Sequence, residues 1–487
     1  MFKNVNCKNL PSLRRNIVYQ FLYELLIVFI PLFTIPYVSR VLGAENIGLF
    51  SYTYAVANYF VLFANLGIKN YGSRTIAMVR NNKEELNRNF SEILSIHIIF
   101  SIIVIFVYLV LLFFFVEDNL VIFLIQSIYV FAAVFDINWF FFGIEKFKLT
   151  VGRNTLVKIL SVFLVLVFVK TQTDLWIYAL ILALSVFVGQ SVVWFALKQY
   201  VSWRRPSWAN MKQHIRPLFV LFLPILALSL YKYMDKIMLG SISSNVQVGF
   251  YENAEKIINV PMSLIMAFGV VLMPRIANMV TSKDKGEVFK LIDMSMEAVM
   301  LLAIAISFGL AGISFVLAPI FFGYEFEECG ILIMGLAVTV PFMAFANVIR
   351  TQYLIPYKED KIFVVSLFLG AAVNLIVNII LIPYMAARGA VIGTIFAEII
   401  VCIYQSYFVR KKIFIKKYLL NTIPPILIGI VMFVFVFQIG NVMNINIVTL
   451  ILQLLVGMFI YAVGVFLLML KSRTRLMVLL RKFVVRY

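Results

Sequence analysis

The sequence predicts an all-α, polytopic membrane protein with about 14 transmembrane helices. The 487 residues are 63% hydrophobic and only 13% charged, whereas soluble domains are about half apolar and about 25% charged. The apolar residues also fall in runs of about 20, the length that a helix needs to cross roughly 30 Å of hydrocarbon. The connections between these runs are too short for a soluble domain, so we expect the protein to act within or across the bilayer.

The first apolar run, residues 17–39, follows Lys3, Lys8, Arg14 and Arg15, as in a signal peptide. It is too long for the apolar part of a signal peptide, and no small-residue cleavage site follows it, so we interpret it as a retained first helix. The remaining predicted helices are 46–67, 91–116, 119–142, 151–169, 175–197, 217–239, 249–273, 292–318, 329–349, 362–383, 390–408, 421–439 and 446–470.

The basic residues alternate between the loops in a way that predicts orientation. Of 42 Lys and Arg, 35 lie in one set of loops and termini and four lie within helices, which leaves Arg40, Lys170 and Arg388 for the opposite loops. Because Lys and Arg are retained on the cytoplasmic side, both termini are predicted to be cytoplasmic. We interpret the net charge of +19 as a cytoplasmic collar facing anionic lipid headgroups, with no need for nucleic acid.

A weak internal repeat suggests two halves. Residues 40–52 join the first two predicted helices, and residues 236–253, six helices later, join the seventh and eighth with a similar pattern. An even offset makes the copies parallel, an arrangement in which transporters bind substrate between the halves. The predicted domains are two pseudo-symmetric six-helix lobes, 1–200 and 201–412, and a C-terminal pair of helices with a basic tail, 413–487.

Charged residues gather on the hairpin formed by the seventh and eighth predicted helices. They are Lys232, Asp235, Lys236, Glu252, Glu255 and Lys256. A charge at a helix centre costs about 2.5–3.5 kcal/mol on insertion scales, so each needs a partner or water. Lys232 and Lys236 are four residues apart and share a face, and Asp235 can pair with Lys232. Two interpretations stand: a hydrated substrate cavity, or salt bridges that hold the hairpin together.

The first two predicted helices are more polar than charged. Glu24 lies in the first, Arg40 at its outer end, and Asn58 and Asn65 share a face of the second. These amides suit sugar hydroxyls, although hydrogen bonds between helices explain them nearly as well.

No catalytic or metal-binding pattern stands out. Cys7, Cys329 and Cys402 lie far apart in the sequence, and neither a Walker A loop nor a hydrolase or zinc-protease motif is present. We therefore expect no enzyme activity, no cofactor and no metal site. Transport energy would come from an ion gradient or from the gradient of the substrate itself.

Several motifs resemble polysaccharide repeat-unit flippases of the multidrug/oligosaccharidyl-lipid/polysaccharide exporter superfamily. Each motif is weak, but together they cover nearly the whole chain in order. They are Pro36–Gly43, Gly48–Tyr52, Asn65–Gly67, Tyr71–Arg74, Met234–Gly240, Asn253–Ile257, Met273–Arg275, Asn374–Pro383 and Arg388–Ala390.

The resemblance implies a V-shaped pair of lobes plus two further helices. The implied substrate is an oligosaccharide on undecaprenyl diphosphate, flipped from the cytoplasmic to the outer leaflet for capsule, exopolysaccharide or O-antigen synthesis. Implied partners are this lipid, membrane lipids, the polysaccharide polymerase and the export machinery. Relatives have a cationic cavity for the diphosphate, and the positions that match it are Arg40, Lys69, Arg74, Lys232, Lys236, Lys256 and Arg275.

The acids interleaved with these cations depart from that pattern. They suggest a looser grip on diphosphate, or a role in ion coupling, for which the candidates are Glu24, Asp235, Glu252 and Glu255. Two related functions remain open. One is a peptidoglycan lipid-precursor flippase, which also has 14 helices. The other is an ion-coupled multidrug antiporter, which usually has 12 and needs no groove for a polyprenyl chain.

Overall fold

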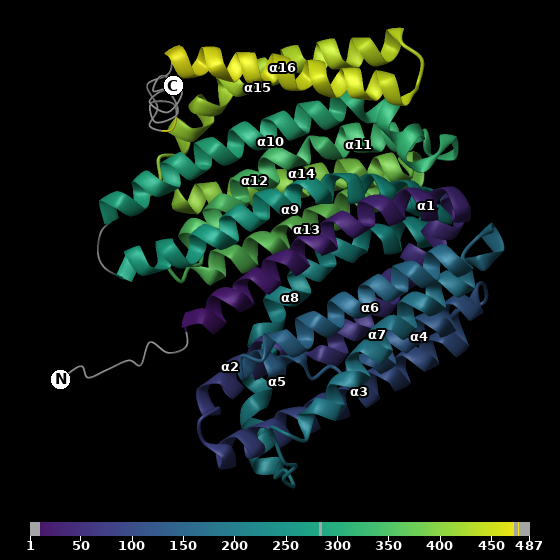
Figure 1. Cartoon of the computed structure of the whole chain (residues 1–487), viewed down its shortest axis with the longest axis vertical. Coiled ribbons are helices and arrows are strands. Elements are labelled where there is room, and N and C mark those ends of the chain that lie inside the picture. Colours follow the sequence, from purple (N-terminus) through teal and green to yellow (C-terminus); the bar gives the residue numbers. More distant parts are fainter. Residues whose placement is uncertain (1–9, 282–284, 472–475, 477–487) are drawn as a thin grey trace. The chain divides into compact units, whose positions relative to one another are not determined.

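The computed structural model describes residues 10–281, 285–471 and 476, without the side chains of residues 10–32 and of a few later positions. The described part is built of helices and contains no strand (Figure 1). Twelve helical segments in it are long and apolar enough to cross a membrane. These findings confirm the prediction of an all-α, polytopic membrane protein.

The chain forms two compact units, Met1–Tyr233 and Met234–Tyr487, which divide within helix α8. The first unit contains α1 (Leu10–Asn65), α2 (Ile68–Val79), α3 (Lys83–Phe115), α4 (Leu120–Val134), α5 (Asn138–Gly143), α6 (Phe147–Phe168), η2 (Gln172–Asp174), α7 (Leu175–Leu197) and most of α8 (Trp208–Ile242). The second continues with α9 (Asn245–Thr281), α10 (Lys285–Phe322), η3 (Tyr324–Phe326), α11 (Cys329–Ala337), α12 (Thr339–Ile349), η4 (Arg350–Leu354), α13 (Asp360–Met385), α14 (Ala387–Val409), α15 (Ile415–Val442) and α16 (Ile447–Lys471). The predicted domains 1–200, 201–412 and 413–487 stay a prediction.

The first two predicted spans are the two arms of α1. The helix changes direction at Gly43, whose φ of 78° and ψ of 172° lie outside the helical region. A positive φ carries little strain only for glycine, because glycine has no Cβ. The Asn46 side chain spans the kink by donating to the Leu42 carbonyl at 2.9 Å. Counted this way, with α4 and α5 forming one span and α11 and α12 another, the described helices correspond to the 14 predicted ones.

Several helices extend beyond their apolar runs. Helix α8 begins at Trp208 and α10 at Lys285, about two turns before the predicted starts at 217 and 292. Helix α2 was not predicted as a separate element. This 12-residue helix is amphipathic, with one buried face and one exposed face. Polar residues therefore interrupt its apolar ones, and hydropathy does not reveal it.

Small residues allow helices of the second unit to pack closely. A Cβ on Gly393 of α14 would lie 2.1 Å from Asn378 Oδ1 of α13, and one on Gly429 of α15 would lie 2.5 Å from the Phe308 ring of α10. Helices α15 and α16 lie side by side along α10 (Figure 1). Met432, Val436 and neighbouring apolar side chains form a core between them.

Candidate functional site

The charged hairpin of the second unit is formed by the end of α8 and the start of α9. Lys236 Nζ lies 2.5 Å from Glu252 Oε2 and 2.8 Å from Glu255 Oε2, and Lys256 Nζ lies 3.1 Å from Glu252 Oε1. The three α9 residues share a face because they are three and four residues apart. Lys236 is only 7% exposed, so its charge depends on these carboxylates. Two cations and two anions leave this network neutral.

Asp235, the residue before Lys236, belongs to a separate cluster of neutral groups. Its Oδ2 accepts from the Tyr251 hydroxyl at 2.6 Å and from the Thr394 hydroxyl at 3.0 Å, and its Oδ1 accepts from Asn378 Nδ2 at 2.5 Å. Asp235 is 4% exposed, and no described Lys or Arg forms an ion pair with it. The suggested pairing with Lys232 is therefore replaced by bonds from α9, α13 and α14.

Three predicted site residues of the first unit, Lys232, Asn58 and Asn65, have partners close to them in the sequence. Lys232 lies over the Tyr233 ring, 5.2 Å from its centroid. Asn58 and Asn65 donate back to carbonyls of their own helix, at 2.8 Å to Tyr54 and 2.9 Å to Val61. These bonds lie within α1, so they favour neither sugar binding nor hydrogen bonds between helices.

The remaining candidates are exposed or lie outside the description. Arg40 ends the first arm of α1, Lys69 and Arg74 lie on α2, and Arg275 lies near the end of α9; all four are exposed. Glu24 lies in the first part of α1, and its side chain is outside the described part. The structure thus brings together Lys236, Glu252, Glu255 and Lys256, and places Asp235 beside them in the chain with other partners.

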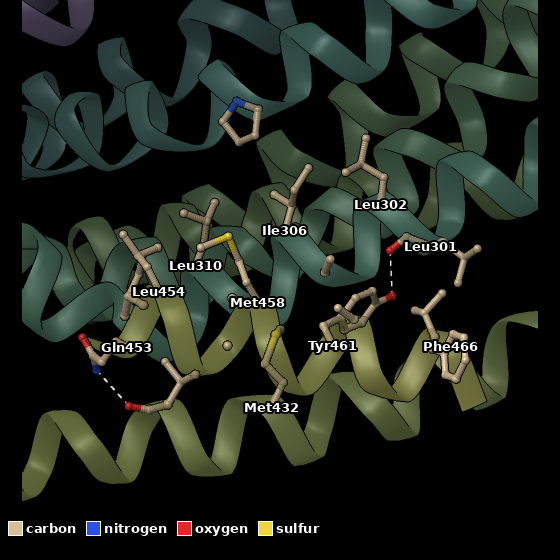
Figure 2. A pocket seen from close by; sticks show the side chains of 18 of the residues that line it. Leu301, Leu302, Ile306, Leu310, Met432, Gln453, Leu454, Met458, Tyr461 and Phe466 are labelled. Atoms are coloured by element: carbon tan, nitrogen blue, oxygen red, sulfur yellow. Dashed lines mark hydrogen bonds between the residues drawn. The ribbon is translucent and has the colours of Figure 1, made fainter. Parts of the chain in front are cut away.

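A large apolar groove lies between α10, α15 and α16 (Figure 2). Its volume is about 950 Å³. Figure 2 shows Leu302 and Ile306 of α10 and Leu454 and Met458 of α16 among the side chains that line it. The two polar side chains in the lining are bonded to backbone: Tyr461 donates to the Leu301 carbonyl at 2.7 Å, and Gln453 to the Val436 carbonyl at 2.8 Å. The groove therefore suits a long hydrocarbon chain.

Among the described residues, no group of three or more His, Cys, Asp or Glu side chains is close enough to hold a metal ion. Cys329 and Cys402 are both free thiols, and Cys7 lies outside the described residues.

A family model described as polysaccharide biosynthesis protein matches residues 13–280, which is more than half of the chain. The chain belongs to this family. A predicted O-antigen transporter from Shigella dysenteriae is 24% identical over 408 residues, covering 81% of this chain and 99% of the relative. Family and relative together confirm the resemblance found in the sequence motifs, and they identify a transporter family rather than an enzyme family.

Two solved structures share the fold. The lipid II flippase MurJ in an inward closed conformation superposes with a TM-score of 0.72 at 16% identity, covering 92% of this chain and 97% of that one. An inward-facing multidrug transporter of the MATE family gives a TM-score of 0.60 at 15% identity, covering 80% of this chain and 97% of that one.

Sequence reasoning missed the partners of Asp235. Tyr251, Asn378 and Thr394 come from three helices, and single polar residues in apolar helices carry little signal. One signal was present: Asn374 and Asn378 are four residues apart in an otherwise apolar run, so they share a face. Asn378 donates to the Asn374 side chain at 3.2 Å as well as to Asp235.

Proposed function

We propose that this family member is a flippase that moves an oligosaccharide on undecaprenyl diphosphate from the cytoplasmic to the outer leaflet of the bacterial cytoplasmic membrane. The observation that carries the proposal is the buried Lys236, which two carboxylates hold at 2.5 and 2.8 Å. A diphosphate can replace those carboxylates as the partner of the ammonium group. The network would thus exchange internal ion pairs for substrate in one state and restore them in another.

Transport would proceed by alternating access. Lys69, Arg74 and Arg275 would capture the diphosphate at the cytoplasmic face, and Lys232, Lys236 and Lys256 would hold it in transit. Release would follow when Glu252 and Glu255 regain the lysines. A ligand shifts such an equilibrium only through its different affinity for the two states, and the competing acids supply that difference.

The apolar groove would hold the polyprenyl chain. Its lining runs along α16 from Gln453 to Met469, which is about 24 Å at 1.5 Å per residue. One leaflet contributes only about 15 Å of hydrocarbon, so the groove continues past the depth at which an ordinary acyl chain ends. A long polyprenyl chain uses such a groove, and a small cationic drug does not. This favours a lipid-linked substrate over the multidrug antiporter alternative.

Asp235 is the strongest of the ion-coupling candidates. Glu252 and Glu255 are occupied by lysines, whereas Asp235 is a buried carboxylate bonded to neutral donors. A cation or proton arriving there would neutralise a buried charge. We propose that this event couples transport to an ion gradient.

Deleting the gene tests the function directly. We expect completed undecaprenyl-diphosphate oligosaccharide to accumulate on the inner leaflet while surface polysaccharide is lost, and mass spectrometry of the lipid would identify the sugar. Normal levels of the lipid-linked unit with intact surface polymer would contradict the proposal.

The fold shared with MurJ favours one second candidate, a peptidoglycan lipid-precursor flippase. Expression of this chain in cells depleted of their own lipid II flippase separates the two. Restored growth would support the second candidate, and lysis despite normal expression would support the repeat-unit substrate.

A further inference from the structure

A buried polar triad in the first unit joins α2, α3 and α8. His214 Nε2 lies 2.9 Å from Glu92 Oε2, and His214 Nδ1 lies 2.6 Å from the Tyr71 hydroxyl. Glu92 is 1% exposed and His214 3% exposed. Neither Glu92 nor His214 was a candidate from the sequence, because they are 122 residues apart and each lies among other charged residues in the first part of its helix.

Both ring nitrogens of His214 have partners. If the ring is neutral with its proton on Nε2, it donates to Glu92 and accepts from Tyr71; if the ring carries two protons, it donates to both. Removing one member of a buried charged cluster is costly, while an apolar replacement of the whole cluster is often neutral. In this structure the triad links α8 to α2 through Tyr71 and to α3 through Glu92.

The segment before α8 is also hydrogen-bonded to α3. The bonds are Ser202 N to Asn87 Oδ1 at 3.0 Å, Arg204 N to Ser91 Oγ at 2.9 Å and Arg204 Nη2 to Glu84 Oε1 at 3.0 Å. At the junction of α1 and α2, Gly67 has a φ of 73°, and a Cβ there would lie 2.9 Å from the Leu218 carbonyl of α8. The N-terminal half of α8 is thus held against α3 and the start of α2.

Helix α2 is short, and its buried face, with Ile68, Gly72, Thr75 and Ile76, packs against α3 and α5. A Cβ on Gly72 would lie 2.5 Å from the Trp139 ring, and Ile76 packs on Gly143, where a Cβ would lie 2.6 Å away. These contacts fix one side of the helix, and the bond from Tyr71 to His214 fixes another. Arg74 is three residues after Tyr71 and neighbours it on the helix surface, so the rotation that places Tyr71 also places Arg74.

We infer that Tyr71, His214 and Glu92 are positioning residues for substrate capture: they fix the rotation of α2 and so aim Arg74, and with it Lys69, at the diphosphate of an incoming lipid. The inference rests on the proposed function, which assigns these two cations to capture. The triad touches no substrate itself. Its loss should therefore weaken binding while leaving the maximal rate of transport unchanged.

The test uses the full-length chain in lipid nanodiscs with undecaprenyl diphosphate as the probe. Tyr71→Phe removes one hydroxyl and leaves the ring in place against His214, so the protein should fold. We expect the Kd to rise about threefold to tenfold, the loss of one hydrogen bond. Arg74→Ala should raise the Kd further, and the double variant should bind no more weakly than Arg74→Ala alone. Tyr37→Phe is the matched control, because it loses a bond to the Val169 carbonyl far from α2 in the sequence.

Hydrogen exchange of residues 68–79 without ligand separates the two proposals. Faster exchange in Tyr71→Phe is expected, and unchanged exchange would overturn the positioning role whatever the affinities. If exchange rises and Arg74→Ala weakens binding, but Tyr71→Phe binds normally or the two effects add, the inference is wrong and the proposed function stands. If Arg74→Ala leaves the Kd unchanged, the capture role of α2 in the proposed function is wrong, and this inference falls with it.

Discussion

Lys236 is the residue at which substrate binding and internal pairing would compete. Its ammonium group has carboxylates at 2.5 and 2.8 Å, and Glu252 shares its other oxygen with Lys256. We expect Lys236→Ala to abolish flipping and to lower the free energy of unfolding by about 1–3 kcal/mol, because it leaves two partly buried carboxylates without their main partner. Transport in proteoliposomes and thermal unfolding measure the two effects. Lys290→Ala, which breaks an exposed pair with Glu287, is the control and should change neither.

A compensating change separates charge balance from substrate binding at this position. Lys236→Ala with Glu255→Gln removes one charge of each sign, so it should recover much of the lost stability while transport stays absent. A double variant that flips substrate at the normal rate would show that Lys236 acts only as an internal counter-ion.

Asp235→Asn should uncouple transport from its driving ion. The amide has nearly the shape of the carboxylate and can still bond to Tyr251, Thr394 and Asn378, so the fold should persist. An imposed proton or sodium gradient should then no longer accelerate flipping in proteoliposomes. Glu328→Gln, at an exposed position just before α11, should leave the acceleration intact. If Asp235→Asn keeps its full response to both gradients, ion coupling lies elsewhere.

Residue contacts could be predicted from the sequence only where spacing decides them. Glu252 and Lys256 are four residues apart on one helix and do form an ion pair. Lys232 and Asp235 have equally suitable spacing, yet Asp235 bonds to α13 and α14. Contacts with residues 143 and 159 positions later depend on tertiary packing, which one sequence does not specify.

The groove along α16 makes a prediction at the scale of an element. Leu454 lines it, whereas the adjacent Leu455 is 57% exposed and does not. We expect Leu454→Trp to slow flipping of a full-length polyprenyl substrate, because the indole fills space that the chain would occupy. Leu455→Trp adds the same bulk on another face and should transport normally. Equal rates in the two variants would exclude the groove as the site of the chain.

Two helix glycines, one in a tightly packed site and one in a loosely packed site, should respond in opposite ways to substitution by alanine. Gly393→Ala should destabilise the protein by about 1–3 kcal/mol through overpacking, since its Cβ would lie 2.1 Å from Asn378 Oδ1. Gly189→Ala on α7 meets its nearest atoms at 3.8 Å and should stabilise the protein by about 0.5–1 kcal/mol, since alanine favours a helix. Thermal unfolding in detergent compares the two. A stabilising effect of Gly393→Ala would show that the packing relaxes.

Elements could be predicted well where an apolar run fills the membrane and poorly at its edges. The predicted run 421–439 lies within α15 and 446–470 nearly coincides with α16. Helix α2 and the first turns of α8 and α10 were missed because they are amphipathic or charged, and hydropathy identifies helices only by their apolar length. The kink at Gly43 was predicted as a loop, since a single glycine with positive φ interrupts a helix without ending it.

The orientation of the whole molecule is the premise that gives the proposed transport its direction. Both termini are predicted to be cytoplasmic, because 35 of the 42 basic residues belong to that side. Tyr384, at the end of α13 near Arg388, is 86% exposed, and Phe414, between Lys412 and Lys416, is 77% exposed. These two positions should lie on opposite faces of the membrane, the first outside and the second inside.

Labelling with a membrane-impermeant maleimide tests this premise in a chain whose native cysteines are replaced by serine. Tyr384→Cys should react in cells stripped of their wall, and Phe414→Cys should react only after the membrane is permeabilised. The reverse pattern would invert the orientation. Lys69, Arg74 and Arg275 would then face outward, where completed units leave, and cations that strengthen binding there would oppose release. The direction of flipping therefore depends on the same charge asymmetry that predicts the topology.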